Sequence, residues 1–424
     1  MLASQETGLV IVVALVVITL TALAGSHADR LSGTTVNNFL NSNTLIQVAT
    51  DASFFAIMAI GATIVIISGG IDLSVGSIYA LSGVAMALFL RGAGSMGPAA
   101  TTLLAGSHPD RTTGITVNNF WNSYTLIQTA TDASFFAIMA IGATMVIISG
   151  GIDLSVGSIY ALSGVSMALF LRGAGPMGGA STALLGLLVC VGVGLACGIL
   201  NGALVVGLRV HPFIITLGTM WVLRGIAFVA TKAESIIVPT SLTAVTKASL
   251  GLGGGLYPVP MLSMLAVTIV GSIYLRRTVM GRHTFAFGGN LEASRFAGLP
   301  LNRIQIGVFA LSGLTAGFAA FLGASFYGST SSGDAQGYEL YVIASAVVGG
   351  ASLIGGRGSA LGATFGALLI VLIRQSIRTL HFDQNYEWIV IGCAIIIAVV
   401  VDQWSTRLTA RRLSRAASAT RVAA

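Results

Sequence analysis

The chain has 424 residues, of which 55% are hydrophobic and only 8% are charged, and its mean hydropathy is +0.91. Because soluble domains carry roughly 25% charged residues, this composition excludes a soluble protein and predicts an all-α fold, a polytopic helical membrane protein. The net charge of +7 does not indicate nucleic-acid binding, because basic residues of membrane proteins usually mark cytoplasmic loops and the only lysines are Lys232 and Lys247.

Apolar stretches recur along the whole chain, and a helix needs about 20 mostly apolar residues to cross a bilayer. We predict spans at 8–24, 53–68, 73–90, 134–149, 154–171, 181–207, 213–231, 259–275, 304–327, 340–356, 359–374 and 388–403. Short stretches such as 340–356 could be re-entrant, so we expect about 10–12 transmembrane helices. The leader MLASQET carries no positive charge, which favours a retained first span over a cleaved signal peptide.

Residues 24–97 recur as 105–178, with identity at 64 of 74 positions. The repeats of transporters are usually weak and inverted, whereas this repeat is direct and nearly identical. It is typical of a recent tandem duplication or of an error in assembling the sequence. Each copy holds two predicted spans, so an extra copy leaves the orientation of everything downstream unchanged. We expect one transmembrane domain over 1–403, followed by a basic tail at 404–424.

Both copies contain the nonapeptide GGIDLSVGS, at 69–77 and 150–158. Its polar residues are Asp72 and Ser74 in the first copy and Asp153 and Ser155 in the second. An Asp followed two residues later by a Ser suits a helix start, so one interpretation is a capped break between two spans. The other interpretation places these residues on a polar translocation path. The two are compatible, because broken helices often line cavities.

A second polar set follows at 211-HPFIITLGTMWVLRG-225. Pro212 suits the first position of a helix, and Thr216 is a mildly polar residue within the predicted span. Arg224 lies in mid-span, where snorkelling or pairing with a carboxylate such as Glu339 competes with contact to a substrate. The loop 328–339, which precedes a predicted span, is expected to be polar, flexible and exposed on the outside.

Basic residues gather at 276–303 and in the tail, and a cytoplasmic N-terminus places both clusters inside. The first cluster contains GRHTFAFGGNLEASRFAGLP, in which 292–298 predicts a short amphipathic helix closed by Gly298. This segment has two interpretations, a solvated connector and a helix that docks into a partner's groove. In the second interpretation, the residues that would couple the chain to its partner are Gly289, Asn290, Glu292, Ala293, Arg295 and Gly298.

No phosphate loop is present, because the chain contains no Gly-Lys pair, and no catalytic or metal-binding set can be assembled from its sequence. The pieces GGIDLSVGS, NGALVVGLRVHPFIITLGTMWVLRG, RTVMGRHTFAFGGNLEASRFAG and YELYVIASAVVGGASLIGGRGSALGATFGALLI follow one another in the chain. In this order they resemble the permease subunits of bacterial sugar ABC importers of the ribose and xylose type.

The resemblance implies a multi-pass protein of the bacterial inner membrane with a cytoplasmic C-terminal tail. Its implied partners are a cytoplasmic ATP-binding subunit, a periplasmic sugar-binding protein, a second permease copy and membrane lipid, and its substrate is a pentose or a related sugar. It implies an EAA-like coupling loop at Glu292, Ala293 and Gly298. The chain would then be no enzyme and bind no cofactor itself, with ATP and Mg²⁺ used by the ATPase.

The duplicated hairpin departs from the family pattern, which has one. The second copy has the family-like downstream context, so duplication is preferred over two working sites. An ion-coupled secondary carrier and a non-functional duplicated permease stay open as alternatives.

Overall fold

A computed structural model describes residues 17–19, 21–28, 35–40, 107–109, 116–118, 123–248, 257–379, 389, 392–393 and 396. The chain divides into two compact units, Met1–Thr101 and Thr102–Ala424. Among the described residues of the first unit, β1 (Ser26–Ala28) and β2 (Thr35–Asn37) form an antiparallel pair. The predicted spans 53–68 and 73–90 lie outside the described residues, as do Asp72, Ser74, the tail and most of 8–24 and 388–403.

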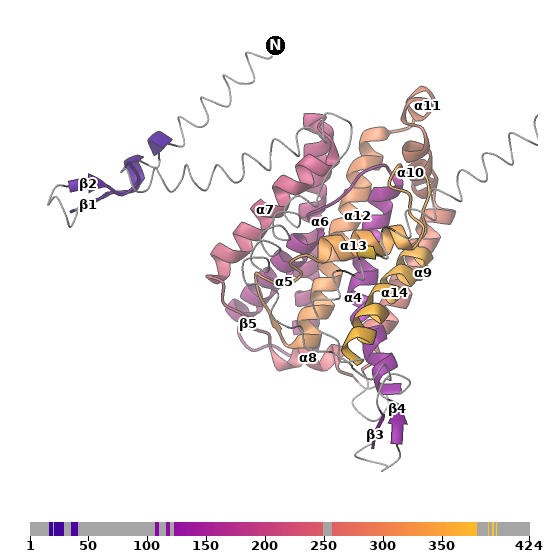
Figure 1. Ribbon diagram of the computed structural model, residues 1–424, viewed down its shortest axis with the longest axis horizontal. Helices are drawn as coiled ribbons and strands as arrows, with labels where there is room; N and C mark the ends of the chain where they lie inside the picture. Colours follow the sequence, from indigo (N-terminus) through magenta and orange to yellow (C-terminus); the bar gives the residue numbers. More distant parts are fainter. Residues whose placement is uncertain are drawn as a thin grey trace, which may run out of the picture. The chain divides into compact units, whose positions relative to one another are not determined.

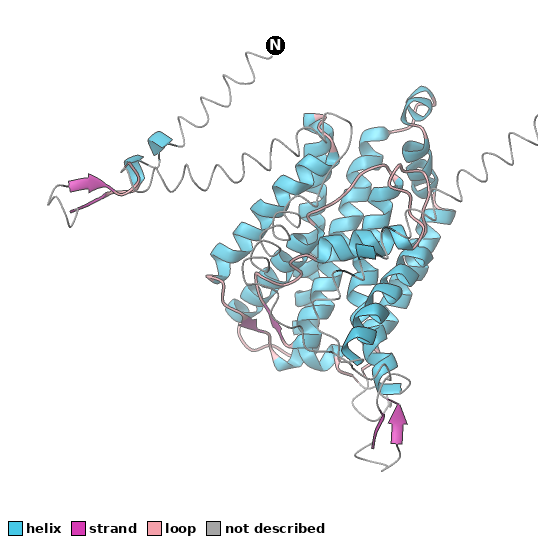
Figure 2. Ribbon diagram, in the orientation of Figure 1, coloured by secondary structure: helices cyan, strands magenta, loops and turns pink. Residues whose placement is uncertain are grey.

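The second unit contains a second strand pair and a bundle of helices (Figures 1 and 2). Its elements are β3 (Ser107–Pro109), β4 (Thr116–Asn118), α4 (Ser123–Ile148), α5 (Val156–Ala174), α6 (Gly179–Leu208), α7 (Pro212–Thr231), β5 (Ile236–Ile237), α8 (Thr240–Thr246), α9 (Val259–Arg277), α10 (Val279–Gly289), α11 (Leu291–Phe296), α12 (Leu301–Tyr327), β6 (Ser329–Thr330), α13 (Tyr338–Val348) and α14 (Ala360–Thr379).

The tandem repeat is visible in the strand pairs. Ser26 lies opposite Asn37 in the first copy, and Ser107 lies opposite Asn118 in the second. The register is therefore the same in both copies, and each repeat starts with the same small hairpin.

Six helices in the described part of the chain are long and apolar enough to cross a membrane. They are Ile127–Ile148, Val156–Ala174, Gly179–Leu208, Pro212–Thr231, Val259–Arg277 and Leu301–Tyr327. Each coincides with one of the predicted spans, and Pro212 occupies the first turn of α7 as predicted. The all-α, polytopic fold class is confirmed.

The spanning helices differ in how far they are enclosed. The span within α4 is 94% buried and packs against α12, α14, α13 and α9, whereas the span within α7 is 22% buried. On α7, Trp221 and Val229 expose 67% and 82% of their surface. A protein that exposes large apolar side chains on its outer helices is suited to a lipid environment, in which such exposure costs nothing.

The contact between α6 and α12 depends on glycine. Gly194 and Gly198 of α6 face Gly313 and Gly317 of α12, and a Cβ on any of the four would overlap backbone atoms of the opposite helix. Small residues spaced four apart let two membrane helices approach until their backbones touch. This contact is the most extensive helix pair in the described structure, so it fixes the position of α12, which contributes Ser312 and Tyr327 to two of the sites described below.

Residues 340–356 do not form a full span, which leaves the re-entrant alternative for this stretch. The stretch 340–356 forms α13 only as far as Val348, and its 11 residues rise about 16 Å. Gly350, with φ +91°, closes the helix, and Ala351 N–H bonds back to Ala346 O at 2.9 Å. The segment therefore turns inside the bundle. Apolar composition alone does not give the position of the turn, because a hydropathy value carries no information on the positive φ that glycine permits.

The loop before α13 also differs from the flexible, exposed loop expected at 328–339. Thr330, Ser332 and Ala335 are buried. β6 pairs with β5, with Ile236 opposite Thr330, and the Asp334 carboxylate accepts the backbone N–H of Ser331 at 2.9 Å. The polar residues of this loop are used in internal hydrogen bonds, so polarity here does not mean solvation.

Candidate functional site

The second GGIDLSVGS peptide forms the break between α4 and α5. Gly150 has φ +78°, a conformation that side chains with a Cβ rarely adopt, and its N–H donates to Ile147 O at 2.9 Å. The N–H of Gly151 donates to Val146 O at 3.0 Å. The two glycines thus end α4 in the manner of a helix C-cap, and the chain then runs without helical structure to Ser155.

Asp153 lies at the centre of the hydrogen bonds in this break and is buried. Its Oδ1 accepts the N–H of Ser155 at 2.9 Å and the hydroxyl of Ser155 at 2.6 Å. Its Oδ2 accepts the hydroxyl of Ser312, in the middle of α12, at 2.8 Å. The side-chain amide of Asn201 on α6 donates to the Ser155 Oγ at 2.7 Å. The carboxyl group of Asp153 thereby connects the start of α5 to α12, and the hydroxyl of Ser155 connects it to α6.

Thr216 brings α7 to the same place. Its hydroxyl donates to the carbonyl of Ile152 at 3.1 Å. Asp153, Ser155 and Thr216, which the sequence presents in two separate polar sets, are therefore neighbours around one break. Asp153 holds the N–H of Ser155, the residue before α5, but no side chain among the described residues caps the first turn of α5 itself. A place on a translocation path stays a prediction.

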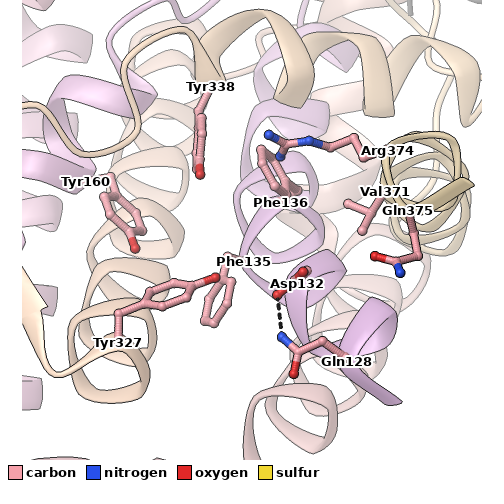
Figure 3. A pocket seen from close by; sticks show the side chains of 10 residues that line it. All are labelled: Gln128, Asp132, Phe135, Phe136, Tyr160, Tyr327, Tyr338, Val371, Arg374 and Gln375. Atoms are coloured by element: carbon pink, nitrogen blue, oxygen red, sulfur yellow. Dashed lines mark hydrogen bonds between the residues drawn. The ribbon is translucent and has the colours of Figure 1, made fainter. Parts of the chain in front are cut away.

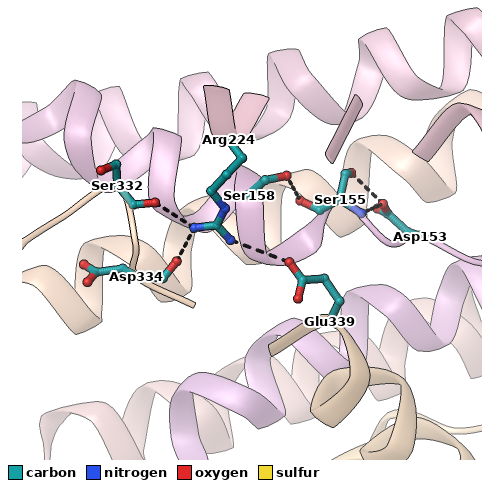
Figure 4. Close-up of polar contacts among 7 residues, drawn as sticks. All are labelled: Asp153, Ser155, Ser158, Arg224, Ser332, Asp334 and Glu339. Carbon is teal, nitrogen blue, oxygen red and sulfur yellow. Dashed lines mark hydrogen bonds and ion pairs between the residues drawn. The ribbon is translucent and has the colours of Figure 1, made fainter. Parts of the chain in front are cut away.

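Arg224 and Glu339 form the second polar cluster (Figure 4). Arg224 Nη2 lies 3.6 Å from Glu339 Oε1, and both side chains are less than a tenth exposed. Arg224 Nη1 donates to the carbonyls of Ser332 and Asp334, at 2.8 and 2.6 Å. The predicted pairing of Arg224 with Glu339 is confirmed, and the guanidinium also holds the loop that precedes α13.

Gly157, the last glycine of the nonapeptide, lies between the two clusters. A Cβ at this position would overlap both the Ala335 carbonyl and the carboxylate of Glu339. The absence of a side chain therefore lets α5 approach the loop and α13, which explains why this position of the motif is glycine.

The predicted coupling residues surround the short helix α11. The Asn290 side chain accepts the N–H of Ala293 at 2.9 Å, which caps the start of the helix. Gly298, with φ +71°, closes it, as the sequence predicts. Glu292 lies in the first turn and Arg295 in the last, where each charge complements the helix dipole.

α11 exposes an apolar surface outside the spanning helices. Leu291 exposes 53% of its surface and Phe296 89%, whereas Ser294 is buried. Gly289, the last residue of α10, approaches Gly356 of the loop before α14. This packing supports one end of the α10–α11 segment and leaves α11 free to meet another molecule.

A cavity of about 320 Å³ was not anticipated from the sequence (Figure 3). It is lined by Gln128, Asp132, Phe135, Phe136, Tyr160, Tyr327, Tyr338, Val371, Arg374 and Gln375. The informative signal was Gln128 and Asp132, four residues apart on one helical face, which hydrogen-bond at 2.9 Å. Within the described part of the chain, no group of three His, Cys, Asp or Glu could hold a metal ion.

Comparison with known proteins gives the family. The family described as "Branched-chain amino acid transport system / permease component" matches residues 125–399, well over half of the chain. The chain belongs to this permease family. The matched range of the permease contains only the second copy of GGIDLSVGS, the copy for which the sequence predicts the family-like context.

Its relatives include named sugar permeases. The permease is 36% identical over 288 residues to the ribose import permease protein of Escherichia coli strain K12, which covers 68% of this chain and 86% of the relative. It is 32% identical over 296 residues to the fructose import permease protein of Rhizobium meliloti, covering 69% and 81%. It is 34% identical over 285 residues to the D-allose transport system permease protein of E. coli K12, covering 67% and 85%. No solved structure matches the permease.

Proposed function

We propose that the permease is the membrane-spanning subunit of an ATP-binding cassette importer that forms the path for a monosaccharide across the bacterial inner membrane. The named relatives import ribose, fructose and allose, which supports a pentose or hexose substrate. The structural observation that carries the proposal is α11. It is a capped, glycine-closed helix that exposes Phe296 and Leu291, and an exposed apolar helix face fits a groove in a partner.

The energy source in this proposal is another chain. ATP and Mg²⁺ would be bound by a cytoplasmic ATP-binding subunit, and the permease would have neither a cofactor nor an enzymatic activity of its own. α11 would occupy a cleft of that subunit, with Gly289, Asn290 and Gly298 setting its position and Glu292, Ala293 and Arg295 on its exposed surface.

The remaining partners follow from the same assignment. A periplasmic sugar-binding protein would deliver the substrate, a second permease copy would complete the path, and the outer helices would face lipid. The positive-inside rule then places the α10–α11 segment and the basic C-terminal tail in the cytoplasm. The residues proposed for the path are Asp72, Ser74, Asp153, Ser155, Thr216, Arg224 and Glu339.

Reversing the charge of α11 tests the coupling role. We expect Glu292→Lys to insert into the membrane like the parent chain but to retain little or no ATPase on co-purification and to import little sugar. The reason is that a lysine in the first turn opposes the helix dipole and inverts the charge presented to the partner. Glu234→Lys is the control, because Glu234 is equally exposed but follows the far end of α7. Full ATPase retention and uptake by Glu292→Lys would exclude this role.

Deleting residues 98–178 tests the duplication. The deletion removes one whole repeat period and joins the first copy to the native sequence at Gly179. Because the copies differ at few positions, we expect the first copy to form the equivalents of α4 and α5, with ATPase retention equal to or better than that of the full chain. Loss of expression or of uptake would show that both hairpins are needed. ATPase retention by the deletion but not by the full chain would favour a non-functional duplicate, and failure of both would count against the importer assignment itself.

A further inference from the structure

The aromatic cavity lies at the end of the bundle remote from the coupling helix. Tyr327, the last residue of α12, lines it, and α12 begins at Leu301, just after α11. The 27 residues of α12 rise about 40 Å between those two points. If α11 meets a cytoplasmic ATPase, the cavity therefore lies toward the opposite side of the membrane.

Its lining combines flat apolar faces with polar groups. Phe136 and Tyr338 lie with ring centroids 4.5 Å apart, and Phe135 and Tyr327 lie 5.7 Å apart. Figure 3 shows Phe135 and Phe136 between the tyrosines on one side and Arg374, Val371 and Gln375 of α14 on the other. Aromatic faces take up the C–H faces of a ring, while hydroxyl, amide, carboxyl and guanidinium groups supply both donors and acceptors.

The charges of the lining balance. Asp132 is the one acidic residue and Arg374 the one basic residue among those that line the cavity. The Arg374 guanidinium lies 5.5 Å from the ring of Phe136 and 5.2 Å from that of Tyr341, so aromatic rings hold its position. A cavity with balanced charges does not favour an anion or a cation. It favours a neutral ligand that exchanges hydrogen bonds with both kinds of group.

The size of the cavity is consistent with a small ligand. Its volume of about 320 Å³ is at the lower end of the ~300–1,000 Å³ typical of small-molecule sites. Ionisable residues inside a membrane bundle generally mark a substrate pathway. A neutral, hydroxyl-rich ring of monosaccharide size matches the volume, the aromatic faces and the mixture of donors and acceptors.

We propose that this cavity is a binding site within the membrane bundle for a neutral monosaccharide, with Asp132 and Tyr338 among its hydrogen-bonding groups. The choice of a sugar rests on the proposed function. The neutrality, size and sidedness of the site come from its lining residues and from the course of α12.

The test is direct binding to the purified full-length chain in lipid nanodiscs, without an ATPase. D-ribose, D-fructose and D-allose are titrated by saturation-transfer NMR against four proteins: the parent, Asp132→Asn, Tyr338→Phe and Tyr274→Phe. Both cavity variants preserve side-chain shape. Tyr274 lies on α9 beside a separate, apolar hollow, so its variant removes a tyrosine hydroxyl elsewhere.

We expect at least one sugar to bind the parent and Tyr274→Phe equally. Asp132→Asn and Tyr338→Phe are each expected to raise the apparent Kd about tenfold, the effect of losing one good hydrogen bond. Binding by a folded parent to none of the three sugars would overturn the proposal, as would equal affinity in all four proteins. If the parent binds sugar but retains no ATPase on co-purification, the cavity assignment stands and the importer assignment fails. If the parent retains an ATPase but binds no sugar, the importer assignment stands and the cavity assignment fails.

Discussion

Gly198→Leu is expected to prevent stable folding of the permease. Gly198 of α6 faces the backbone of Phe309 and Ala310 on α12 so closely that even a Cβ would overlap the Phe309 carbonyl. A leucine there must push the two helices apart along their whole glycine contact. Overpacking typically costs about 1–3 kcal/mol and occasionally more, and separation of a backbone contact places this case at or above the upper end.

The matched control is Gly192→Leu on the same helix, because nothing lies within 4 Å of a Cβ at that position. The measurement is the monodisperse fraction and the thermal-unfolding midpoint of each variant in detergent. We expect Gly192→Leu to behave like the parent. Because leucine is a better helix former than glycine, comparable losses in both variants would show that a leucine anywhere on α6, and not the α6–α12 contact, determines the effect.

Arg224→Met is expected to destabilise the permease by about 3–5 kcal/mol, the cost of removing one partner of a buried ion pair. The variant leaves the carboxylate of Glu339 buried and unpaired, and it removes the donor to the carbonyls of Ser332 and Asp334. We expect a lower thermal-unfolding midpoint and earlier proteolysis within residues 329–337. Arg276→Met is the control, since Arg276 is exposed in the last turn of α9.

A double variant separates the two contributions. Arg224→Met combined with Glu339→Gln removes the unpaired charge but leaves the two loop carbonyls without the guanidinium, so we expect partial recovery of the midpoint. Full recovery would mean that the ion pair alone matters. No recovery would assign the entire effect to the loop carbonyls.

Sequence reasoning predicted the features that depend on local chemistry. The break at Asp153, the start of α7 at Pro212, the partner of Arg224 and the closure of α11 by Gly298 each follow from residue type and spacing. The structure places them as expected. These features need only a few neighbouring residues or a strong requirement for a charge partner in an apolar medium.

Features that depend on which helices pack against each other could not be derived from residue type and spacing. The glycines of α6 and α12 recur every four residues, which signals close packing, but the spacing does not say which helix is the partner. The cavity residues come from α4, α5, α12, α13 and α14, and no local pattern connects them. That 340–356 could be re-entrant was considered, but the position of the turn after Val348 was not predicted, because its residues are as apolar as those of a full span.

The hydrogen bonds around Asp153 have a mechanical consequence. Through Ser312, Asn201 and Thr216 they join α12, α6 and α7 to the start of α5, and the glycine contact locks α6 to α12 along its length. These contacts favour movement of α5, α6, α7 and α12 as one unit. A hinge that alternately opens the two sides of the membrane would therefore be expected to keep these four helices together and to move other helices against them.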